Sequence, residues 1–513
     1  MTSAHRRVVL AATAALAVLL AGCAATPTAR WNPGEAAPGG GPDIAKADWK
    51  PCPDTAEEAI GQQPPSGVEF ECATVKAPQD WNDPDSGETF DVALLRGRSA
   101  RQEPDERIGS LVVNPGGPGG SGVDTAVYLS FTLPSEVLER FDIVGFDPRG
   151  VGRSTAVECF SDEDKDELIG SEPDPASQQE FDEIVDFARD VVEGCERKYG
   201  DTLKYFSTEQ TARDMDAVRE AVGDEKLTYL GYSYGTLLGA VYAKLFPEKI
   251  RAFVLDGAVD PRKDEIEGSK GQAAGFERAF GNFAKWCEDA DSSDCPIGSD
   301  AKAAVNKLIA EARKSPESGS DGRKATAGWV LSAVLYTMYI QEWWPRLAAA
   351  LDELDDGDPD RVFDIVDTFN ERDSDGRYPN SMEILTTVNC VDEEEKLSLE
   401  TVRKLQGDWR EEYPLFGGAL ALSMLNCAVW PDQHDPYPHG EAEGAPPILV
   451  IGTTGDPATP YEQAGELADL LGTGVLITYE GEGHTAYPKP GCLNDTVDDY
   501  LIDLKAPESE VTC

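Results

Sequence analysis

A Gly-x-Ser-x-Gly motif at 231–235 lies between a short apolar run and a stretch with helical periodicity. The apolar run covers residues 227–230, and from Thr236 to Phe246 the apolar residues recur on one face of a helix. Glycines on either side of Ser233 allow the backbone to turn sharply from strand to helix, which lifts the serine hydroxyl clear of the sheet. The segment therefore predicts a buried strand, a tight turn and a helix packed behind it.

Strand-like and helix-like segments alternate along the chain on both sides of this motif. The other strand-like runs are 110–113, 142–146, 251–255, 447–451 and 475–479. Several of them are almost wholly apolar, which is typical of strands covered on both faces. Residues 211–222 have helical spacing. The alternation predicts an α/β fold with a mostly parallel sheet.

The alternation stops between Pro261 and about Ala445, where helical patterns dominate. We expect residues 262–444 to form a helical cap inserted over the sheet. Aromatic residues at helical spacing are expected mainly in the core of this cap, with the lining of a substrate pocket as the alternative; they are Tyr336, Tyr339, Trp343 and Trp344. The mostly acidic run 162–167 is interpreted as a solvated loop.

Metal-binding patterns are weak throughout the sequence. Residues 371–376 resemble a calcium loop only superficially, because the first position is Glu371 and the twelfth is Met382 rather than Glu. We interpret this segment as a polar turn. No Cys-x-x-Cys pair occurs, and only three histidines follow the N-terminal apolar run. Neither a metal site nor a cofactor is expected.

The N-terminus has the pattern of a secretory signal. A short basic region precedes the apolar run 8–21, which is too short for an ordinary transmembrane helix. The Leu-Ala-Gly-Cys sequence that follows resembles a bacterial lipobox, so residues 1–22 are the expected signal peptide and Cys23 the expected lipidation site. Ordinary cleavage near Ala24 is the alternative. The Pro- and Gly-rich stretch 23–48 predicts a tether, which would hold the protein on the outer face of the cell membrane.

Ten cysteines remain after Cys23, an even number that fits an oxidising compartment. We expect five disulfides between sequence neighbours, because short loops close easily and each pair falls within one structural block. The expected pairs are Cys52–Cys72, Cys159–Cys195, Cys287–Cys295, Cys390–Cys427 and Cys492–Cys513. Other pairings stay open, since a sequence alone does not define connectivity.

The chain is strongly acidic. Its 513 residues include 95 Asp and Glu against 45 Lys and Arg, which gives a net charge of −50. A surface of that sign repels nucleic-acid phosphates, so nucleic acid is excluded as a partner. A hydrophobic content of 40% excludes disorder throughout the chain.

Ser233 requires a base, because a serine hydroxyl is a weak nucleophile that is usually activated by an imidazole held by a carboxylate. Folds with this strand-to-helix turn have the chain order Ser, acid, His. His484 follows the strand-like run 475–479, whereas His434 and His439 lie in a Pro-rich stretch of the insertion. His484 is therefore the predicted base.

Asp456 is the predicted acid. It follows the run 447–451 and precedes His484 by 28 residues, an interval that fits one strand–helix–strand passage. Asp256 and Asp260, which follow the preceding strand, are its rivals. A structural alternative is that Asp456 caps a helix beginning near Tyr461, although Thr459 is able to take that role instead.

The segment 114–120, Asn-Pro-Gly-Gly-Pro-Gly-Gly, leaves the strand-like run 110–113. Acyl transfer needs two N–H donors for the tetrahedral oxyanion. The predicted donors are the backbone N–H groups of Gly117 and of Tyr234, the residue after Ser233. A phosphate cradle is excluded, because no Gly-Lys-Ser/Thr follows and the chain is acidic. A simple flexible turn remains the alternative.

Four motifs occur in one order, at 114–119, 147–154, 231–236 and 455–460. Together they resemble the secreted actinobacterial tripeptidyl aminopeptidases, relatives of the prolyl aminopeptidases, over about residues 49–513. The resemblance implies an α/β-hydrolase core made of 49–261 and 445–513. It also implies a helical cap and a serine exopeptidase that releases short peptides from a free N-terminus through an acyl-enzyme. The prolyl relatives usually have His-Gly-Gly-Pro where this chain has Pro at position 115, which weakens an expectation of strict prolyl preference.

The prolyl relatives bind the substrate amine with acidic cap residues, and the resemblance points to the segment 388–395 for this role. Asp392 or Glu393 would face the cationic α-amine, with Cys390 fastening the backbone. An acidic surface turn without function is the alternative.

Two other functions fit parts of the sequence. A carboxylesterase or lipase would use the same triad, and only the cap would distinguish it. A non-catalytic lipoprotein that binds peptides would retain the turn at Ser233 without using it. The expected partners are peptide substrates and, through the lipid alone, a membrane; the sequence does not predict an oligomeric state.

Overall fold

A ten-stranded sheet forms the base of the fold, in a computed structural model that describes residues 44–64 and 66–513. The strand order is β1-β2-β3-β5-β4-β6-β7-β10-β11-β12. The strands are β1 (Lys50–Pro51), β2 (Val68–Pro78), β3 (Thr89–Ser99), β4 (Gly109–Asn114), β5 (Phe141–Phe146), β6 (Leu227–Tyr232), β7 (Ile250–Asp256), β10 (Ile448–Gly455), β11 (Gly474–Glu482) and β12 (Val511–Thr512). The predicted signal peptide, Cys23 and the tether up to residue 43 lie outside the described residues.

The sheet is parallel from β5 to β12 and antiparallel at its other end. The pairs β1–β2, β2–β3 and β3–β5 are antiparallel. From β5 through β4, β6, β7, β10 and β11 to β12, each neighbouring pair is parallel. The α/β fold and the mostly parallel sheet predicted from the alternation are confirmed. The long antiparallel strands β2 and β3 were not among the predicted runs, because their charged and small residues hide the strand signal.

Both faces of the central strands are buried. Along β10, Ile448 and Val450 belong to one hydrophobic core, and Leu449 and Ile451 belong to a second core on the opposite face. The same alternation occurs along β4 and β7, because successive side chains of a strand point to opposite faces. This two-sided burial explains why the runs are almost wholly apolar in sequence.

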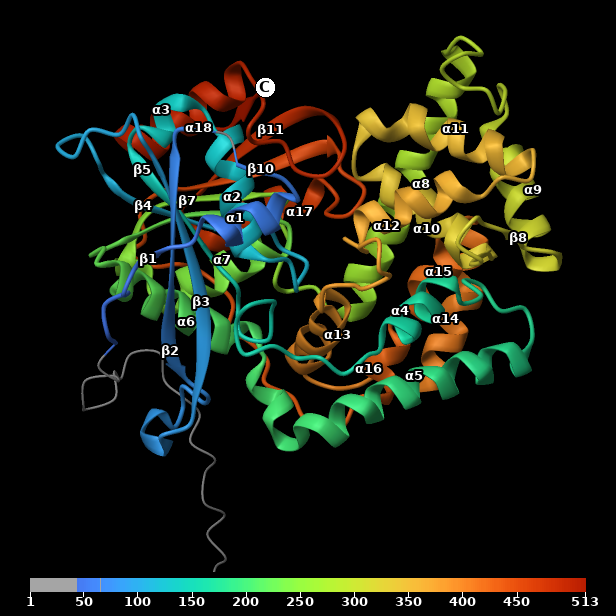
Figure 1. The fold of residues 1–513 in the computed structure, drawn as a ribbon, viewed down its shortest axis with the longest axis horizontal. Coiled ribbons are helices and arrows are strands. Elements are labelled where there is room, and N and C mark those ends of the chain that lie inside the picture. Colours follow the sequence, from blue (N-terminus) through green and yellow to red (C-terminus); the bar gives the residue numbers. More distant parts are fainter. Residues whose placement is uncertain (1–43, 65) are drawn as a thin grey trace, which may run out of the picture. The chain divides into compact units, whose positions relative to one another are not determined.

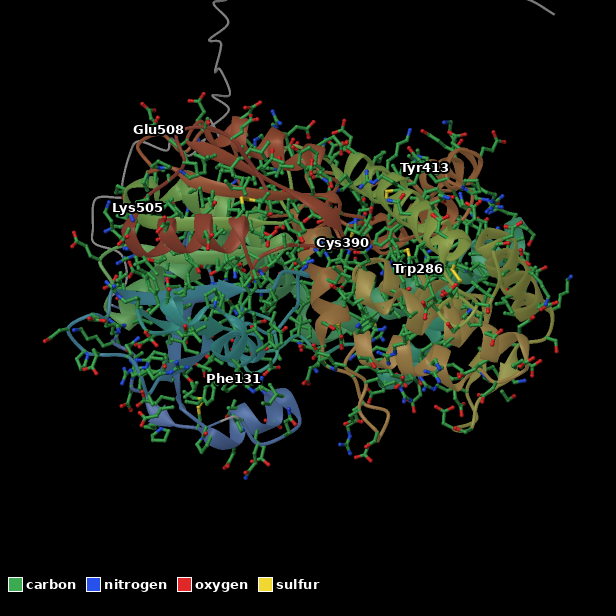
Figure 2. The ribbon with its side chains drawn as sticks, turned by 90° about the horizontal axis from the view of Figure 1, so that it is seen from above. Phe131, Trp286, Cys390, Tyr413, Lys505 and Glu508 are labelled. Atoms are coloured by element: carbon green, nitrogen blue, oxygen red, sulfur yellow. A yellow bond between two sulfur atoms is a disulfide. The ribbon has the colours of Figure 1, made fainter. Side chains whose placement is uncertain are left out.

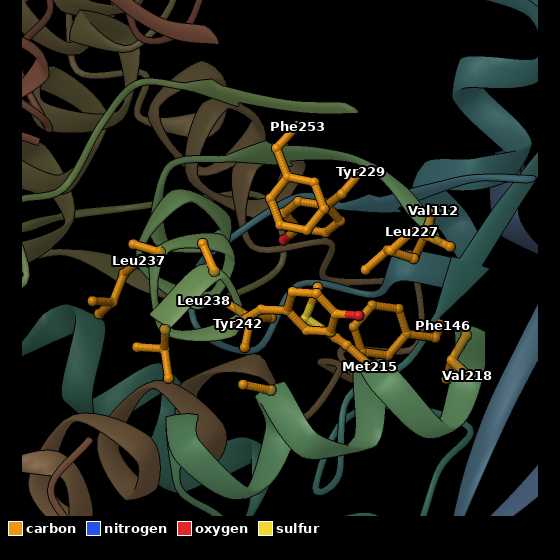
Figure 3. Packing of buried hydrophobic residues seen from close by; sticks show 14 of the residues in the cluster. Val112, Phe146, Met215, Val218, Leu227, Tyr229, Leu237, Leu238, Tyr242 and Phe253 are labelled. Carbon is orange, nitrogen blue, oxygen red and sulfur yellow. The ribbon is translucent and has the colours of Figure 1, made fainter. Parts of the chain in front are cut away.

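Helices cover the two faces of the sheet. They are α1 (Pro53–Ile60), α2 (Gly122–Thr132), α3 (Ser135–Leu138), α6 (Thr208–Val222), α7 (Tyr234–Leu245), α17 (Glu462–Leu471) and α18 (Cys492–Asp503). Figure 3 shows the core beside α6 and α7, to which Met215 of α6 and Tyr242 of α7 both contribute. The ring of Tyr242 packs against that of Phe253 on β7, with centroids 5.5 Å apart. The helix predicted from Thr236 is α7, which begins directly after Ser233.

The remaining helices form the cap. They are α4 (Asp162–Gly170), α5 (Gln178–Tyr199), α8 (Glu265–Asp289), α9 (Ala301–Lys314), α10 (Ala327–Met338), α11 (Trp344–Asp355), α12 (Asp360–Phe369), α13 (Ser381–Asp392), α14 (Leu399–Glu412), α15 (Gly417–Leu422) and α16 (Leu425–Val429). Two short strands, β8 (Glu317–Ser318) and β9 (Lys324–Ala325), pair with each other within it. Short 3-10 turns are η1 (Pro84–Ser86), η2 (Gly200–Tyr205), η3 (Pro247–Lys249) and η4 (Gln341–Trp343).

The cap includes more of the chain than the expected range 262–444. Helices α4 and α5 precede the nucleophile segment in sequence, yet α5 shares hydrophobic cores with α13, α14 and α16. Figure 1 shows α4 and α5 lying with α13–α16 rather than against the sheet. A helix buries its apolar stripe against whichever surface is complementary, so sequence order alone did not reveal this partner.

The acidic run 162–167 is not a solvated loop, because it forms most of α4. The Ser161 side chain and Asp164 make a reciprocal capping box at its start, and carboxylates are favourable in the first turn of a helix. Lys165 is buried and forms an ion pair with Glu383 of α13 at 3.0 Å. The single lysine that interrupts the acidic run therefore attaches α4 to α13.

The motif at 147–154 holds several core elements together from a buried position. Arg149 is 1% exposed, and its guanidinium donates to both carboxylate oxygens of Asp214 on α6 at 2.6 and 2.7 Å. Its remaining N–H groups donate to the carbonyl oxygens of Pro78, Gln79 and Tyr205. A buried charge is tolerated only when paired and hydrogen-bonded, and here every donor of the fork is used.

Five disulfides join the ten cysteines in the pairs that the sequence predicts: Cys52–Cys72, Cys159–Cys195, Cys287–Cys295, Cys390–Cys427 and Cys492–Cys513. Figure 2 draws them as yellow bonds, with Cys390 labelled. Such a set indicates an oxidising, extracytoplasmic compartment. Across residues 44–64 and 66–513 we find no helix with the length and apolarity needed to span a membrane.

We predict that replacing Cys492 and Cys513 together by serine lowers the free energy of unfolding by about 3 kcal/mol, because the bridge closes a loop of 21 residues in the unfolded chain. The bridge also holds β12 against β11, so limited proteolysis should release the last residues of the variant. Denaturant unfolding under non-reducing conditions measures the loss. An unchanged unfolding midpoint, together with an intact C-terminus, would contradict the prediction.

Candidate active site

Ser233 occupies a strained turn between β6 and α7. Its φ is +54° and its ψ is −125°, a region that residues with a side chain rarely adopt. Its backbone N–H donates to the carbonyl oxygen of Asp256 at 2.9 Å, and its own carbonyl accepts the N–H of Thr236 at 2.8 Å. The turn is therefore held from the neighbouring strand β7 and from the first turn of α7.

The two glycines of the motif are required by close backbone contacts. A Cβ at Gly231 would lie 2.4 Å from the carbonyl oxygen of Gly235. A Cβ at Gly235 would lie 2.8 Å from the side-chain oxygen of Asn114, at the end of β4. Both distances are shorter than carbon and oxygen tolerate, so only glycine allows the strand and helix to approach this closely.

Asp456 and His484 form a buried acid–base pair. His484 Nδ1 lies 2.9 Å from each carboxylate oxygen of Asp456. Asp456 follows β10 directly and is fully buried, and the His484 side chain is 11% exposed. With the carboxylate at Nδ1, the N–H is held on that nitrogen, which leaves the lone pair of Nε2 free to accept a proton.

The pKa of His484 is raised above its ordinary value. Burial by itself lowers this pKa, but the charge of Asp456, its hydrogen bond and the more distant charge of Asp256 together outweigh the burial. Nε2 is buried and has no hydrogen-bond partner in the described part of the chain. This is the ring nitrogen that the predicted base would use to take the proton of Ser233, and in enzymes without substrate such contacts are often long.

Thr459 contacts both members of the pair. Its hydroxyl donates to Asp456 Oδ2 at 3.0 Å and lies 3.4 Å from His484 Nδ1. The backbone N–H groups of Ala458 and Thr459 donate to Asp456 Oδ1, each at 2.9 Å. The segment therefore folds back on the carboxylate and orients it, and Asp456 does not act as a helix cap. From the sequence, Thr459 is expected only as an alternative helix cap; its spacing of three residues from Asp456 is the signal for the contact.

The rival acids have other roles. Asp260 pairs with Arg262 at 2.8 Å. Asp256, at the end of β7, accepts the backbone N–H of Ala486 at 2.9 Å and of Tyr487 at 2.7 Å. Burial, opposed by these hydrogen bonds and by His484, raises the pKa of Asp256 to about 6. Asp256 therefore supports the loop that carries His484, while Asp456 holds its imidazole.

The glycine-rich loop after β4 lies against the turn at Ser233. A Cβ at Gly116 would lie 2.9 Å from Cβ of Ser233 and 3.1 Å from the backbone nitrogen of Tyr234. Tyr234 begins α7, so its N–H is one of the donors that a helix leaves unpaired. The geometry thus brings the neighbourhood of Gly117 beside the N–H of Tyr234, as an oxyanion-binding site requires.

Asp392, one of the two predicted amine-binding residues, is the last residue of α13, and Glu393, the other, follows it. Both carboxylate oxygens of Asp392 are engaged by Thr208, through its N–H at 2.9 Å and its hydroxyl at 2.5 Å. The same hydroxyl lies 2.7 Å from that of Tyr234. A chain of hydrogen bonds thus runs from Tyr234 through Thr208 to Asp392. Asp392 therefore holds its own segment against the start of α6.

Glu393 lies beside Glu265, the first residue of α8. Glu265 was not among the site residues predicted from the sequence. Burial and the charge of Asp264 raise the pKa of Glu393 to about 7, and burial and the charge of Glu393 raise the pKa of Glu265 to about 8. In the described residues neither carboxylate forms an ion pair. Acidic residues are so common in this chain that no signal in the sequence distinguishes Glu265.

The four aromatic residues of the insertion divide between the cap core and the site. Trp344 is buried in the cap core, as expected, and Tyr336 stacks on Phe369 with ring centroids 4.0 Å apart. Tyr339 instead meets the imidazole of His484 edge to face, with centroids 5.4 Å apart. No group of three or more metal-binding side chains occurs among residues 44–64 and 66–513.

Taken together, the elements supply a nucleophile on a strained turn, a base whose tautomer is set by a buried carboxylate, and backbone donors beside the nucleophile. Such a combination is able to perform acyl transfer through a covalent intermediate.

Comparison with known proteins agrees with this geometry. The α/β hydrolase fold family model matches residues 109–489. The chain is 36% identical to the serine protease Hip1 of Mycobacterium tuberculosis, over 99% of this chain and 98% of that protein. It is 32% identical to the tripeptidyl aminopeptidase of Streptomyces lividans (91% and 87%), and 34% identical to carboxylesterase B of M. tuberculosis (86% and 86%). The resemblance found in the sequence motifs is thereby confirmed, and the chain belongs to the α/β hydrolase family as a serine hydrolase.

Proposed function

We propose that the protein is an extracytoplasmic serine exopeptidase that releases short peptides, tripeptides in the first place, from free N-termini. The similarity to a tripeptidyl aminopeptidase and to a serine protease supports peptide substrates. The observation that carries the exopeptidase proposal is a pair of partly buried carboxylates, Glu265 and Glu393, which form no ion pair within the described part of the chain. They lie beside the segment that contacts Tyr234 through Thr208 and Asp392.

In the proposed reaction, Nε2 of His484 takes the hydroxyl proton of Ser233 as Oγ attacks the scissile carbonyl carbon. The backbone N–H groups of Gly117 and Tyr234 donate to the oxyanion that forms. His484 then gives the proton to the leaving amine, which departs and leaves an acyl-enzyme. Water, deprotonated by the same imidazole, hydrolyses this ester and restores Ser233.

The raised pKa values of Glu265 and Glu393 fit a cation-binding site. Burial and nearby negative charge favour the protonated form of a carboxyl group, so both groups would gain from a neighbouring positive charge. A substrate α-ammonium placed between them would remove that repulsion, whereas an acetylated or internal peptide offers no charge. An extended tripeptide spans about 10 Å, so a carboxylate at about that distance from the scissile bond would select tripeptides.

An esterase is the second candidate, because carboxylesterase B is similar over most of the chain. The triad chemistry is shared, and an alkoxide leaves more easily than an amine. The two candidates differ in what the acidic pair contributes. It is essential for a peptide with a free amine and irrelevant for a small neutral ester.

We also propose that Cys23 is lipidated and holds the enzyme on the outer face of the membrane, since the Leu-Ala-Gly-Cys sequence follows a secretory apolar run. Peptides would then be cleaved outside the cell, where the disulfides are stable. Metabolic labelling with a fatty-acid analogue, compared with a Cys23→Ala variant, tests the anchor.

We expect Ser233→Ala to lower kcat by about a thousandfold or more, because the covalent route is lost while a single hydroxyl contributes little packing. His484→Ala and Asp456→Asn should also be nearly inactive, and double variants should show no additive loss. Steady-state kinetics with circular dichroism as a folding check measure the effect. Retention of more than about a tenth of wild-type turnover by folded Ser233→Ala would exclude the assignment.

Asp256→Asn should move the acidic limb of the kcat/KM profile to lower pH. The base acts as neutral imidazole, and the negative charge of Asp256 favours the imidazolium, so removing that charge lowers the pKa of His484. Asp260→Asn is the matched control, since Asp260 pairs with Arg262 and does not contribute to this pKa. A limb that stays in place in Asp256→Asn, or that moves equally in both variants, would contradict the electrostatic role.

Glu265→Gln and Glu393→Gln should each raise KM for a free-amine tripeptide substrate about tenfold, while KM for a small neutral ester stays unchanged. N-acetylation of the tripeptide should abolish its turnover by the wild type. Glu395→Gln, at an exposed position of the same segment, serves as the control, because the charge of Glu394 itself acts on Glu393. Asp392→Asn should act mainly on stability, because its carboxylate binds Thr208. Equal cleavage of acetylated and free peptides would leave an endopeptidase or an esterase.

A further inference from the structure

One face of the cap helix α8 lies directly on the loop that carries Asp456. A Cβ at Gly275 would lie 2.3 Å from the carbonyl oxygen of Pro457, so helix and loop meet at backbone distance. The guanidinium of Arg278 donates to the main-chain carbonyl of Asp456 itself at 2.6 Å. Gln272 donates to the carbonyl of Ala458 at 3.2 Å. These positions recur at intervals of three residues and share one helix face.

The same face of α8 reaches the strand that leads to His484. Asn282, four residues after Arg278, donates from Nδ2 to Oε1 of Glu482 at 2.8 Å. Glu482 is the last residue of β11 and stands two positions before His484. Helix α8 therefore contacts both the loop after β10 that carries Asp456 (the acid loop) and the end of β11, where the loop that carries His484 (the base loop) begins.

The end of cap helix α10 contacts the base directly. The backbone N–H of His484 donates to the carbonyl oxygen of Tyr339 at 2.8 Å. Gly483 has a φ of +101°, and a Cβ there would lie 2.9 Å from the same oxygen, so only glycine permits the approach. The Tyr339 ring packs against the imidazole and also against Phe276 of α8, with centroids 5.4 Å apart in each case.

We propose that the cap positions the acid and the base for catalysis. In this proposal Arg278, Asn282 and Tyr339 fix the acid and base loops relative to each other. The proposal rests on the assignment of Asp456 and His484 as acid and base. The core supports the same base loop from below, through the carboxylate of Asp256. Because the cap contacts main-chain atoms of both loops, a displacement of α8 or α10 would change the geometry of the acid–base pair.

This role differs in its kinetics from that of a wall of the substrate pocket. A pocket residue affects KM for peptides and leaves a small ester unaffected. A residue that positions the acid–base pair affects kcat for every substrate, because proton transfer is common to all of them. Loss of such a residue also slows the covalent labelling of Ser233 by a fluorophosphonate, because this labelling needs the base but few contacts with the pocket.

We expect Arg278→Met to lower kcat about tenfold for both a tripeptide substrate and a small neutral ester, with KM nearly unchanged and labelling slowed by the same factor. Arg278→Lys should restore much of the rate, because an ammonium still donates to the carbonyl of Asp456. Asn282→Ala removes one hydrogen bond to Glu482, and Tyr339→Leu removes the ring contact with His484 but keeps the backbone carbonyl. Both should produce smaller losses of the same kind. All variants are measured as the full chain with disulfides intact.

Arg313→Met is the matched control. Arg313 of α9 makes three hydrogen bonds to Glu172 within the cap, and its contacts do not involve the acid or base loop. It should lower cap stability without slowing the labelling of Ser233. Unchanged labelling in folded Arg278→Met and Asn282→Ala, or an effect on peptide KM alone, would overturn the proposal. Failure of the acid–base assignment would be distinguishable, since His484→Ala would then be active.

Discussion

The left-handed backbone of Ser233 is the constraint on which the rest of the site depends. A side chain in that conformation is tolerated because β6, α7 and β7 hold the turn by main-chain hydrogen bonds, and because glycines on both sides let strand and helix nearly touch. The same close packing brings the glycine-rich loop after β4 against Tyr234. The predicted nucleophile and oxyanion donors therefore come from one packing arrangement at the carboxyl edge of the parallel strands, where α/β sheets place their ligands.

Electrostatics assigns different roles to carboxylates that look alike in sequence. Asp456 is buried against His484 with three donors around it, and it favours the charged imidazole that forms during proton transfer. Asp256 lies one strand away, accepts backbone N–H groups and has a pKa of about 6. In a chain with a net charge of −50, function follows from which carboxylates are enclosed and what they face.

The cap combines two tasks that are often separate. Its acidic pair, Glu265 and Glu393, lies where a substrate amine is proposed to bind, and its helices α8 and α10 contact the loops of Asp456 and His484. Glu265 begins the helix that carries Arg278, so the proposed amine site and the proposed support of the acid and base loops share helix α8. The cap is stapled internally by Cys287–Cys295 and Cys390–Cys427.

Local patterns were sufficient to predict the parallel strands, the turn at Ser233, the five disulfides and the pairing of Asp456 with His484. Apolar runs, glycine spacing and the scarcity of histidine each leave few alternatives within a short stretch of chain. The sequence did not reveal that α4 and α5 join the cap, that Thr208 engages Asp392, or that Arg278 and Tyr339 hold the acid and base loops. Those contacts join residues far apart in the chain; Thr208 and Asp392, for example, are 184 positions apart. They depend on which helix faces become complementary after folding, and no local periodicity encodes that choice.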